Sequence, residues 1–68
     1  MKRIGTLVRW SKDYHFGQHN VGKVGIIVSF TYDIGYKIWW SDGRTSGGFY
    51  EHHFNTPNGP LVVIHESR

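Results

Sequence analysis

The side chains with the most evident chemistry are five histidines, a residue type that often ligates transition metals. His15 and His19 lie in one polar stretch, and His52 and His53 are adjacent. Neighbouring residues on a turn point apart, whereas a metal site needs three or four converging ligands. The chain has no cysteine and no HExxH pattern. We therefore expect exposed or capping histidines, with no metal site and no other cofactor.

Acid–base catalysis would have to come from three aspartates and two glutamates. Asp33 and Asp42 fall in turn signals, where the side chain serves the backbone. No pair of carboxylates remains with a spacing that would bring two of them together. Gly47 and Gly48 lie in the middle of a predicted strand, so they do not form a phosphate-binding loop between a strand and a helix. The sequence predicts that the protein is not an enzyme.

The whole chain has a net charge of +3, and its basic residues are concentrated near its start. A basic region attracts polyanions, and each phosphate contact adds salt-sensitive affinity. The alternative is a solvated surface that keeps a small protein soluble. The candidates for phosphate contacts in the first 23 residues are Lys2, Arg3, Arg9, Lys12 and Lys23.

Two adjacent tryptophans, Trp39 and Trp40, precede the turn signal Asp42-Gly43. Successive side chains of a strand point to opposite faces, so one ring belongs to the core and the other does not. A two-residue loop at 42–43 predicts a hairpin in which Trp40 faces the core. Trp39 is then predicted to lie outside, beside Lys37.

That hairpin register pairs Trp39 with Ser46 and Tyr36 with Phe49, and places Gly48 diagonally from the indole of Trp39. No large side chain of the partner strand would then cover the ring. Three alternatives follow for Trp39. It could lie in an interface with another protein or a second copy, it could be covered by the loop 11–22, or it could stack on a nucleic-acid base next to Lys37.

The elements that must position these residues are β-strands, because apolar residues alternate or form short β-branched runs. Strands are predicted over 3–10, 23–31, 35–41, 44–50 and 61–66. A long loop over 11–22 and a single turn over 51–54 complete the chain, and Gly25 predicts a bend or bulge. The second strand is expected to direct Val24, Ile26, Val28 and Phe30 to one face. The predicted core is Val8, Val28, Ile38, Trp40, Phe49 and Phe54.

With 68 residues the chain is one domain with a small core, in which its eleven aromatic residues must supply much of the buried area. The basic start runs into an alternating stretch and not into an apolar one, so we expect no signal peptide and a cytoplasmic location. No segment is long enough to cross a bilayer, so we expect no membrane contact.

The chain resembles SH3-like barrels of the KOW and Tudor type, and among them short proteins of tailed bacteriophages. The resemblance rests on "GTLV" (5–8), "VGKVGIIV" (21–28), "YKIWWSDG" (36–43) and the aromatic ending at Phe54. It implies a five-stranded SH3-like barrel with a one-turn helix before the last strand. The KOW likeness implies contact with RNA or the ribosome.

The Tudor likeness implies an aromatic cage for a methylated cation. The rings outside the predicted core are Tyr14, Phe16, Tyr32 and Trp39.

The sequence thus predicts an all-β, non-enzymatic binding or adaptor module of phage type. Its expected partner is a protein or a second copy of itself. The residues expected to contact it are Trp39, Lys37, Tyr32, Tyr14 and Phe16. The alternative is weak, nonspecific binding of single-stranded nucleic acid, for which the candidate residues are Lys2, Arg3, Arg9, Lys23, Lys37 and Trp39.

Overall fold

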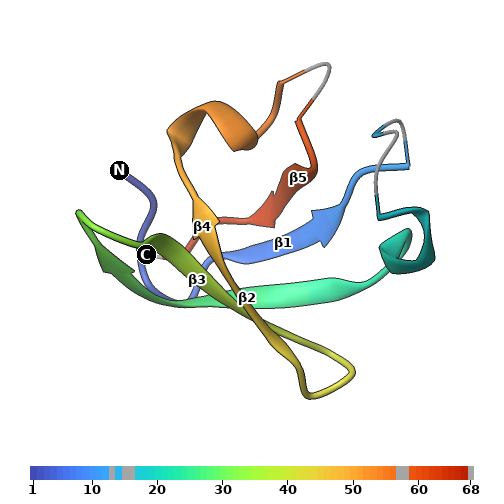
Figure 1. Cartoon of the computed structure of the whole chain (residues 1–68), viewed down its shortest axis with the longest axis horizontal. Helices are drawn as coiled ribbons and strands as arrows, with labels where there is room; N and C mark the ends of the chain where they lie inside the picture. The colour runs from blue at the N-terminus through green and yellow to red at the C-terminus, as the bar shows by residue number, and fades with distance from the viewer. Residues whose placement is uncertain (13, 15–16, 57–58, 68) are drawn as a thin grey trace.

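The computed structural model describes residues 1–12, 14, 17–56 and 59–67 of the chain (Figure 1). They form five strands and two single 3-10 turns. The elements are β1 (Leu7–Trp10), η1 (Gln18–Asn20), β2 (Val24–Thr31), β3 (Gly35–Trp40), β4 (Thr45–Phe49), η2 (Glu51–His53) and β5 (Leu61–His65). The predicted all-β class is confirmed. None of the described residues belongs to a helix long and apolar enough to span a bilayer.

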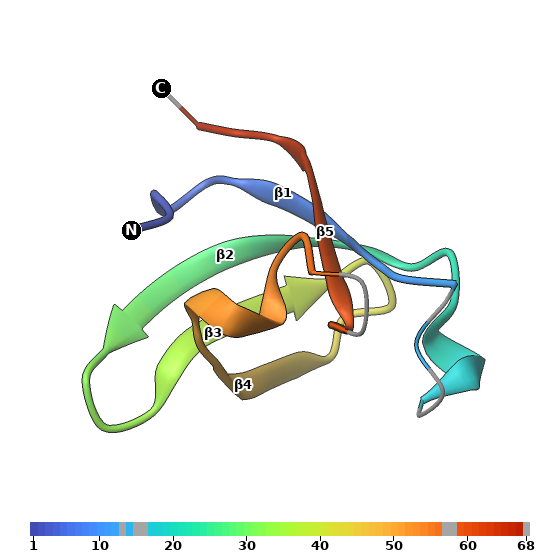
Figure 2. The same cartoon turned by 90° about the horizontal axis from the view of Figure 1, so that it is seen from above.

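The five strands form one antiparallel sheet in the order β4-β3-β2-β1-β5. Strand β2 is long and bent, and it connects the β1 and β5 side of the sheet to the β3 and β4 side (Figure 2). Within the described residues, strand pairing does not join β4 to β5, so the sheet is not closed into a barrel.

The core lies on the inner face of this bent sheet, where η2 returns the chain so that Phe54 packs edge-on against Tyr36 with ring centroids 5.2 Å apart. Trp10 and Trp40 meet edge to face at 5.9 Å. Aromatic pairs of this geometry add to the area that they bury. The buried apolar residues are Val8, Trp10, Ile27, Tyr36, Ile38, Trp40, Phe54 and Leu61.

Four of the six predicted core residues are buried: Val8, Ile38, Trp40 and Phe54. Phe49 is partly buried and packs against this core.

The predicted inward face of β2 is wrong. Gly25 and Ile27 are buried, whereas Val28 is 38% exposed and Val24 is also exposed. The β2–β3 register shifts between Ile27 and Ser29, so Val28 occupies a bulge. Beyond the bulge the strand turns Phe30 back against the core.

Gly25 is not the site of the bulge. Close packing explains why this position is a glycine. A Cβ atom at this position would lie 2.6 Å from Ile38 Cγ2 and 2.8 Å from Trp40 Cε3. Such distances are shorter than van der Waals contact, so the β3 side chains occupy the volume that any larger residue would need. The glycine therefore leaves room for the core side chains of Ile38 and Trp40 above β2.

The β3–β4 register differs from the prediction by one residue near the turn. The Trp40 N–H donates to the Arg44 carbonyl at 2.7 Å, and the Gly43 N–H donates to the Trp40 carbonyl at 2.9 Å. The loop therefore has three residues and ends at Gly43 with φ 87°. As a result Trp39 pairs with Thr45 and Ile38 with Ser46.

The predicted pair Tyr36–Phe49 is nevertheless correct, because a second irregularity cancels the first. The register shifts again between Tyr36 and Ile38, opposite Gly47 and Gly48. Gly48 has φ 84°, a conformation that glycine adopts without strain. The two glycines thus form a bulge that corrects the pairing.

The first strand is shorter than predicted, because a turn closed by the Thr6 N–H and the Arg3 carbonyl precedes it and leaves Ile4 exposed. A polar cluster then ties the start of the chain to η2. The Tyr36 hydroxyl accepts the Lys2 N–H at 2.6 Å and donates to Glu51. The Lys2 ammonium lies 3.1 Å from the same carboxylate.

This polar cluster shifts two pKa values. The hydrogen bond from Tyr36, aided by Lys2, lowers the pKa of Glu51 below its ordinary 4.5. Burial, together with the bond to Glu51, raises the pKa of Tyr36 above 10.0. The cluster therefore stabilises the fold with Glu51 ionised and Tyr36 neutral.

Glu51→Gln should lower the free energy of unfolding at neutral pH, because it removes the charge that Tyr36 and Lys2 contact. The loss should be only about 1 kcal/mol, because the carboxylate is half exposed and solvent screens it. A lowered folded pKa contributes stability above pH 4.5 that is lost as the pH falls through the folded value. Urea unfolding of both proteins between pH 7 and about pH 3 should show the two stabilities converging in acid. A difference that stays constant with pH would contradict this origin.

Candidate functional site

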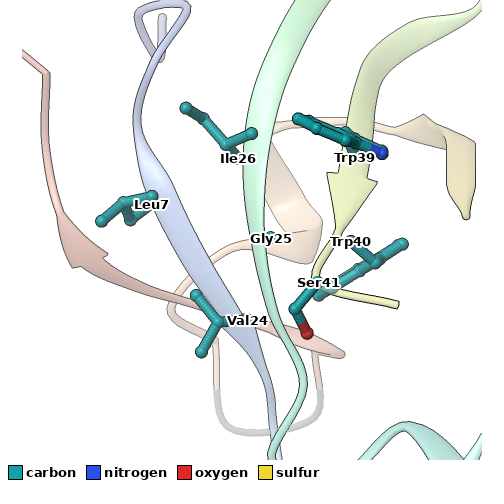
Figure 3. Close-up of a pocket in the computed structure, with 7 residues that line it drawn as sticks. All are labelled: Leu7, Val24, Gly25, Ile26, Trp39, Trp40 and Ser41. Atoms are coloured by element: carbon teal, nitrogen blue, oxygen red, sulfur yellow. The ribbon is translucent and has the colours of Figure 1, made fainter. Parts of the chain in front are cut away.

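A row of apolar side chains crosses the outer face of the sheet. Ile26 of β2 pairs with Leu7 of β1 on one side and with Trp39 of β3 on the other. Figure 3 shows Ile26 and Trp39 facing one another across the two strands, with Leu7 on the next strand. Val24 lies two residues along β2 on the same face, and these four residues line one pocket together with Gly25, Trp40 and Ser41. We call Leu7, Val24, Ile26 and Trp39 the outer patch.

Trp39 is the most exposed member of this patch at 53%, whereas Trp40 on the core side is 6% exposed. The predicted facing of the two rings is therefore correct. The Trp40 Nε1–H donates to Ser46 Oγ at 3.0 Å, so its polar atom is satisfied inside. Across β4 the neighbour of Trp39 is Thr45 and not Ser46 as predicted. Thr45 is also small, so the indole stays open on that side.

The described part of the loop 11–22 contacts a different tryptophan. The ring of Tyr14 meets Trp10 edge to face at 5.6 Å. Gly17 lies so close to Trp10 that a Cβ would be 2.8 Å from the indole Cζ2. These described contacts place the loop against Trp10, whereas Trp39 is half exposed.

Positive charge flanks the outer patch on two sides. Lys37 is exposed two residues from Trp39 along β3, on the same face. Arg9 is half-buried on β1 and pairs with Val24. Neither forms an ion pair with another described residue, and none of the five strands contains an acidic residue.

Two of the remaining basic residues that were predicted for a phosphate-binding edge are paired with acids. Lys23 is held by Asp42 at 2.7 Å, and Lys2 is held by Glu51. Arg3 and Lys12 are exposed outside the strands. The bond from Lys23 is also the main reason why the pKa of Asp42 is lowered.

The predicted aromatic residues are dispersed. Tyr32 is 92% exposed at the β2–β3 turn, where it contacts only the ring of Phe30 among the described aromatic side chains. Tyr32 is six positions along the chain from Ile26, the partner of Trp39, which is a span of at most about 20 Å. Tyr14 packs against the core, and Phe16 lies outside the described residues. The described rings therefore do not converge as a cage.

Two of the histidines, His52 and His53, lie together in η2 with ring centroids 4.0 Å apart. His53 Nδ1 accepts the Tyr50 N–H at 2.8 Å, and burial lowers the pKa of His53, with a smaller effect from His52. His19 is exposed, and His15 is outside the described residues. In the described part of the chain no three histidine or acidic side chains are grouped as metal ligands.

Sequence reasoning missed three of the four patch residues: Leu7, Val24 and Ile26. Val24 and Ile26 were expected inside, with Val28. The available signal was the run "VGIIV", which is apolar at both alternating sets of positions and therefore supplies apolar residues to both faces.

These features define a small all-β domain with an aromatic and aliphatic patch on the outer face of its sheet. No protein-family model, no curated protein and no solved structure matches the chain.

Proposed function

We propose that the protein is a non-enzymatic binding module that contacts another protein through the outer patch. The observation that carries this proposal is the half-exposed indole of Trp39 at the end of a continuous apolar row across three strands. Single exposed apolar residues are ordinary, whereas a contiguous patch is typical of an interaction site.

The composition of the patch favours a protein partner. Tryptophan is enriched at the energetic centres of protein interfaces, where it fills pockets and excludes water. The other three members are aliphatic, so they offer apolar area without a further ring. Because paired strands hold all four backbones, little conformational entropy would be lost when the patch is covered.

We further infer an SH3-like arrangement of the strands. The long β1–β2 connection, the tight β3–β4 turn and the 3-10 turn before β5 support this interpretation. Kinship with KOW-type, Tudor-type and phage proteins, and a cytoplasmic location, belong to the same proposal and rest on the sequence.

The test is a selection from a random displayed peptide library with wild type and Trp39→Ala as baits. Peptides enriched by wild type should bind Trp39→Ala at least about tenfold more weakly, as expected when a central interface tryptophan is truncated. Tyr32→Ala is the matched control, because it removes an exposed ring far from the patch. If no enriched peptide depends on Trp39, the proposed function is wrong.

Nucleic-acid binding is the second candidate, favoured by the position of Lys37 beside the exposed ring. Since Lys2 and Lys23 are engaged in ion pairs, about two cations remain for phosphate contacts near the patch. The slope of log affinity against log salt for a single-stranded oligonucleotide should then be roughly −1 to −2. Titration with labelled oligo-dT at low and physiological salt measures it, and absence of binding at low salt would exclude this candidate.

A further inference from the structure

We infer that the outer patch binds an acidic peptide segment with a bulky apolar residue between two acidic ones. The inference rests on the proposed function and names the chemistry of the partner. It follows from the charges that surround the patch, considered together with its apolar centre.

The strands carry cations and no acids. Arg9 and Lys37 are the charged side chains on the outward positions of β1, β2 and β3, and no aspartate or glutamate occurs in any of the five strands. The acid closest in sequence to the patch residues of β3 is Asp42, and its carboxylate is bonded to Lys23. The charged side chains that the strands place beside the patch are therefore cations, which favours an acidic partner.

The two cations lie at opposite corners of the patch. Arg9 of β1 is beside Val24 of β2. Lys37 of β3 is on the other side of the row formed by Leu7, Ile26 and Trp39. Two strand spacings and four residues along the strands separate their backbones by roughly 16 Å. In an extended segment, acidic residues four positions apart lie on one side and about 13–14 Å apart, within reach of two long, flexible side chains. A residue midway between them would lie over Ile26 and Trp39.

The same geometry argues against the other occupants. In a face-to-face pair of copies, the strands of one copy would offer no acid to pair with the cations of the other, and the net charge of +3 would add repulsion. A single-stranded nucleic acid would find one ring for stacking and three aliphatic side chains that cannot stack. An acidic, apolar peptide satisfies both the charges and the apolar centre.

The experiment extends the library selection to charge-reversed baits. Wild type should enrich peptides with acidic residues flanking a bulky apolar residue. The double variant Arg9→Glu/Lys37→Glu should bind a synthesised wild-type-selected peptide about tenfold more weakly in fluorescence polarisation at low salt, and should itself enrich basic flanks. Arg3→Glu/Lys12→Glu changes the net charge equally at exposed positions outside the strands, and should bind the same peptide within twofold of wild type. Thermal unfolding of each variant verifies that it is folded.

The outcomes separate the two proposals. If wild type enriches apolar peptides without acidic flanks, and Trp39→Ala loses them, the binding surface stands and the charge inference is overturned. Equal losses in the two double variants would also overturn it, because net charge alone would then explain the effect. If none of the selected peptides binds Trp39→Ala more weakly than wild type, both proposals would be overturned. Trp39-dependent binding of oligo-dT that is tighter than that of any selected peptide would assign the patch to nucleic acid, and a concentration-dependent dimer lost in Trp39→Ala would assign it to a second copy.

Discussion

Trp40→Ala is expected to leave the protein largely unfolded at room temperature. The ring is buried, meets Trp10 at 5.9 Å and donates its N–H to Ser46. Truncating a buried tryptophan costs about 3–5 kcal/mol, from lost burial and the cavity left behind. A core in a domain of this size supplies only about 3–5 kcal/mol of stability in total. Far-UV circular dichroism with urea and thermal unfolding measures the loss.

The matched control is the adjacent residue. Trp39→Ala removes the same side chain from the outer face, where about half of it is already in water, so the free energy of unfolding should change by about 1 kcal/mol or less. Because Trp39→Ala and Trp40→Ala are the same substitution, the difference between their stabilities measures the effect of burial. A thermal transition that is unchanged in Trp40→Ala and abolished in Trp39→Ala would mean that the faces of β3 are inverted.

Gly35→Ala should cost roughly 2–5 kcal/mol, for two independent reasons. Gly35 has φ 79°, a left-handed conformation that strains any other residue. A Cβ atom would also run into the backbone carbonyl oxygen of Phe49 and lie 3.1 Å from two atoms of the Tyr50 ring. Because the obstacle is backbone, β3 and the end of β4 would have to separate. Urea unfolding at neutral pH measures the cost.

Gly43→Ala separates the two contributions. Gly43 has φ 87°, similar to that of Gly35, but a Cβ there would meet no atom within 4 Å. Its cost should therefore be the conformational strain alone, about 1 kcal/mol. If the two variants were equally stable, the close approach of β4 to Gly35 would not contribute to the fold.

Most strands could be predicted because strand signals are local. β2, β3, β4 and β5 lie within one residue of their predicted ends, since β-branched runs and the Asp42-Gly43 turn specify them without reference to the rest of the chain. The hairpin register near the turn could not be predicted in the same way. A loop of two residues and a loop of three both suit this turn. The pair Tyr36–Phe49 follows from a two-residue loop with regular pairing, or from a three-residue loop followed by the bulge at Gly47 and Gly48, and the structure has the second.

The candidate site was predictable only at its aromatic end. Trp39 could be placed outside and Trp40 inside because alternation along a strand is a covalent consequence of extended backbone. Leu7 and Ile26 could not be assigned to the site, because their neighbours are on other strands. The ion pairs of Lys2 and Lys23 are likewise tertiary, since Glu51 and Asp42 are distant in sequence.

By itself, then, the sequence determined an all-β chain, the positions of its strands and the facing of its two adjacent tryptophans, all of which depend on residues within a few positions of one another. Only the tertiary structure decided which face of the apolar β2 strand enters the core. Gly25 and Ile27 lie inside because the side chains of Ile38 and Trp40 leave room for a glycine and no larger residue at position 25. That packing turns Val24 and Ile26 outward and so creates the patch beside Trp39.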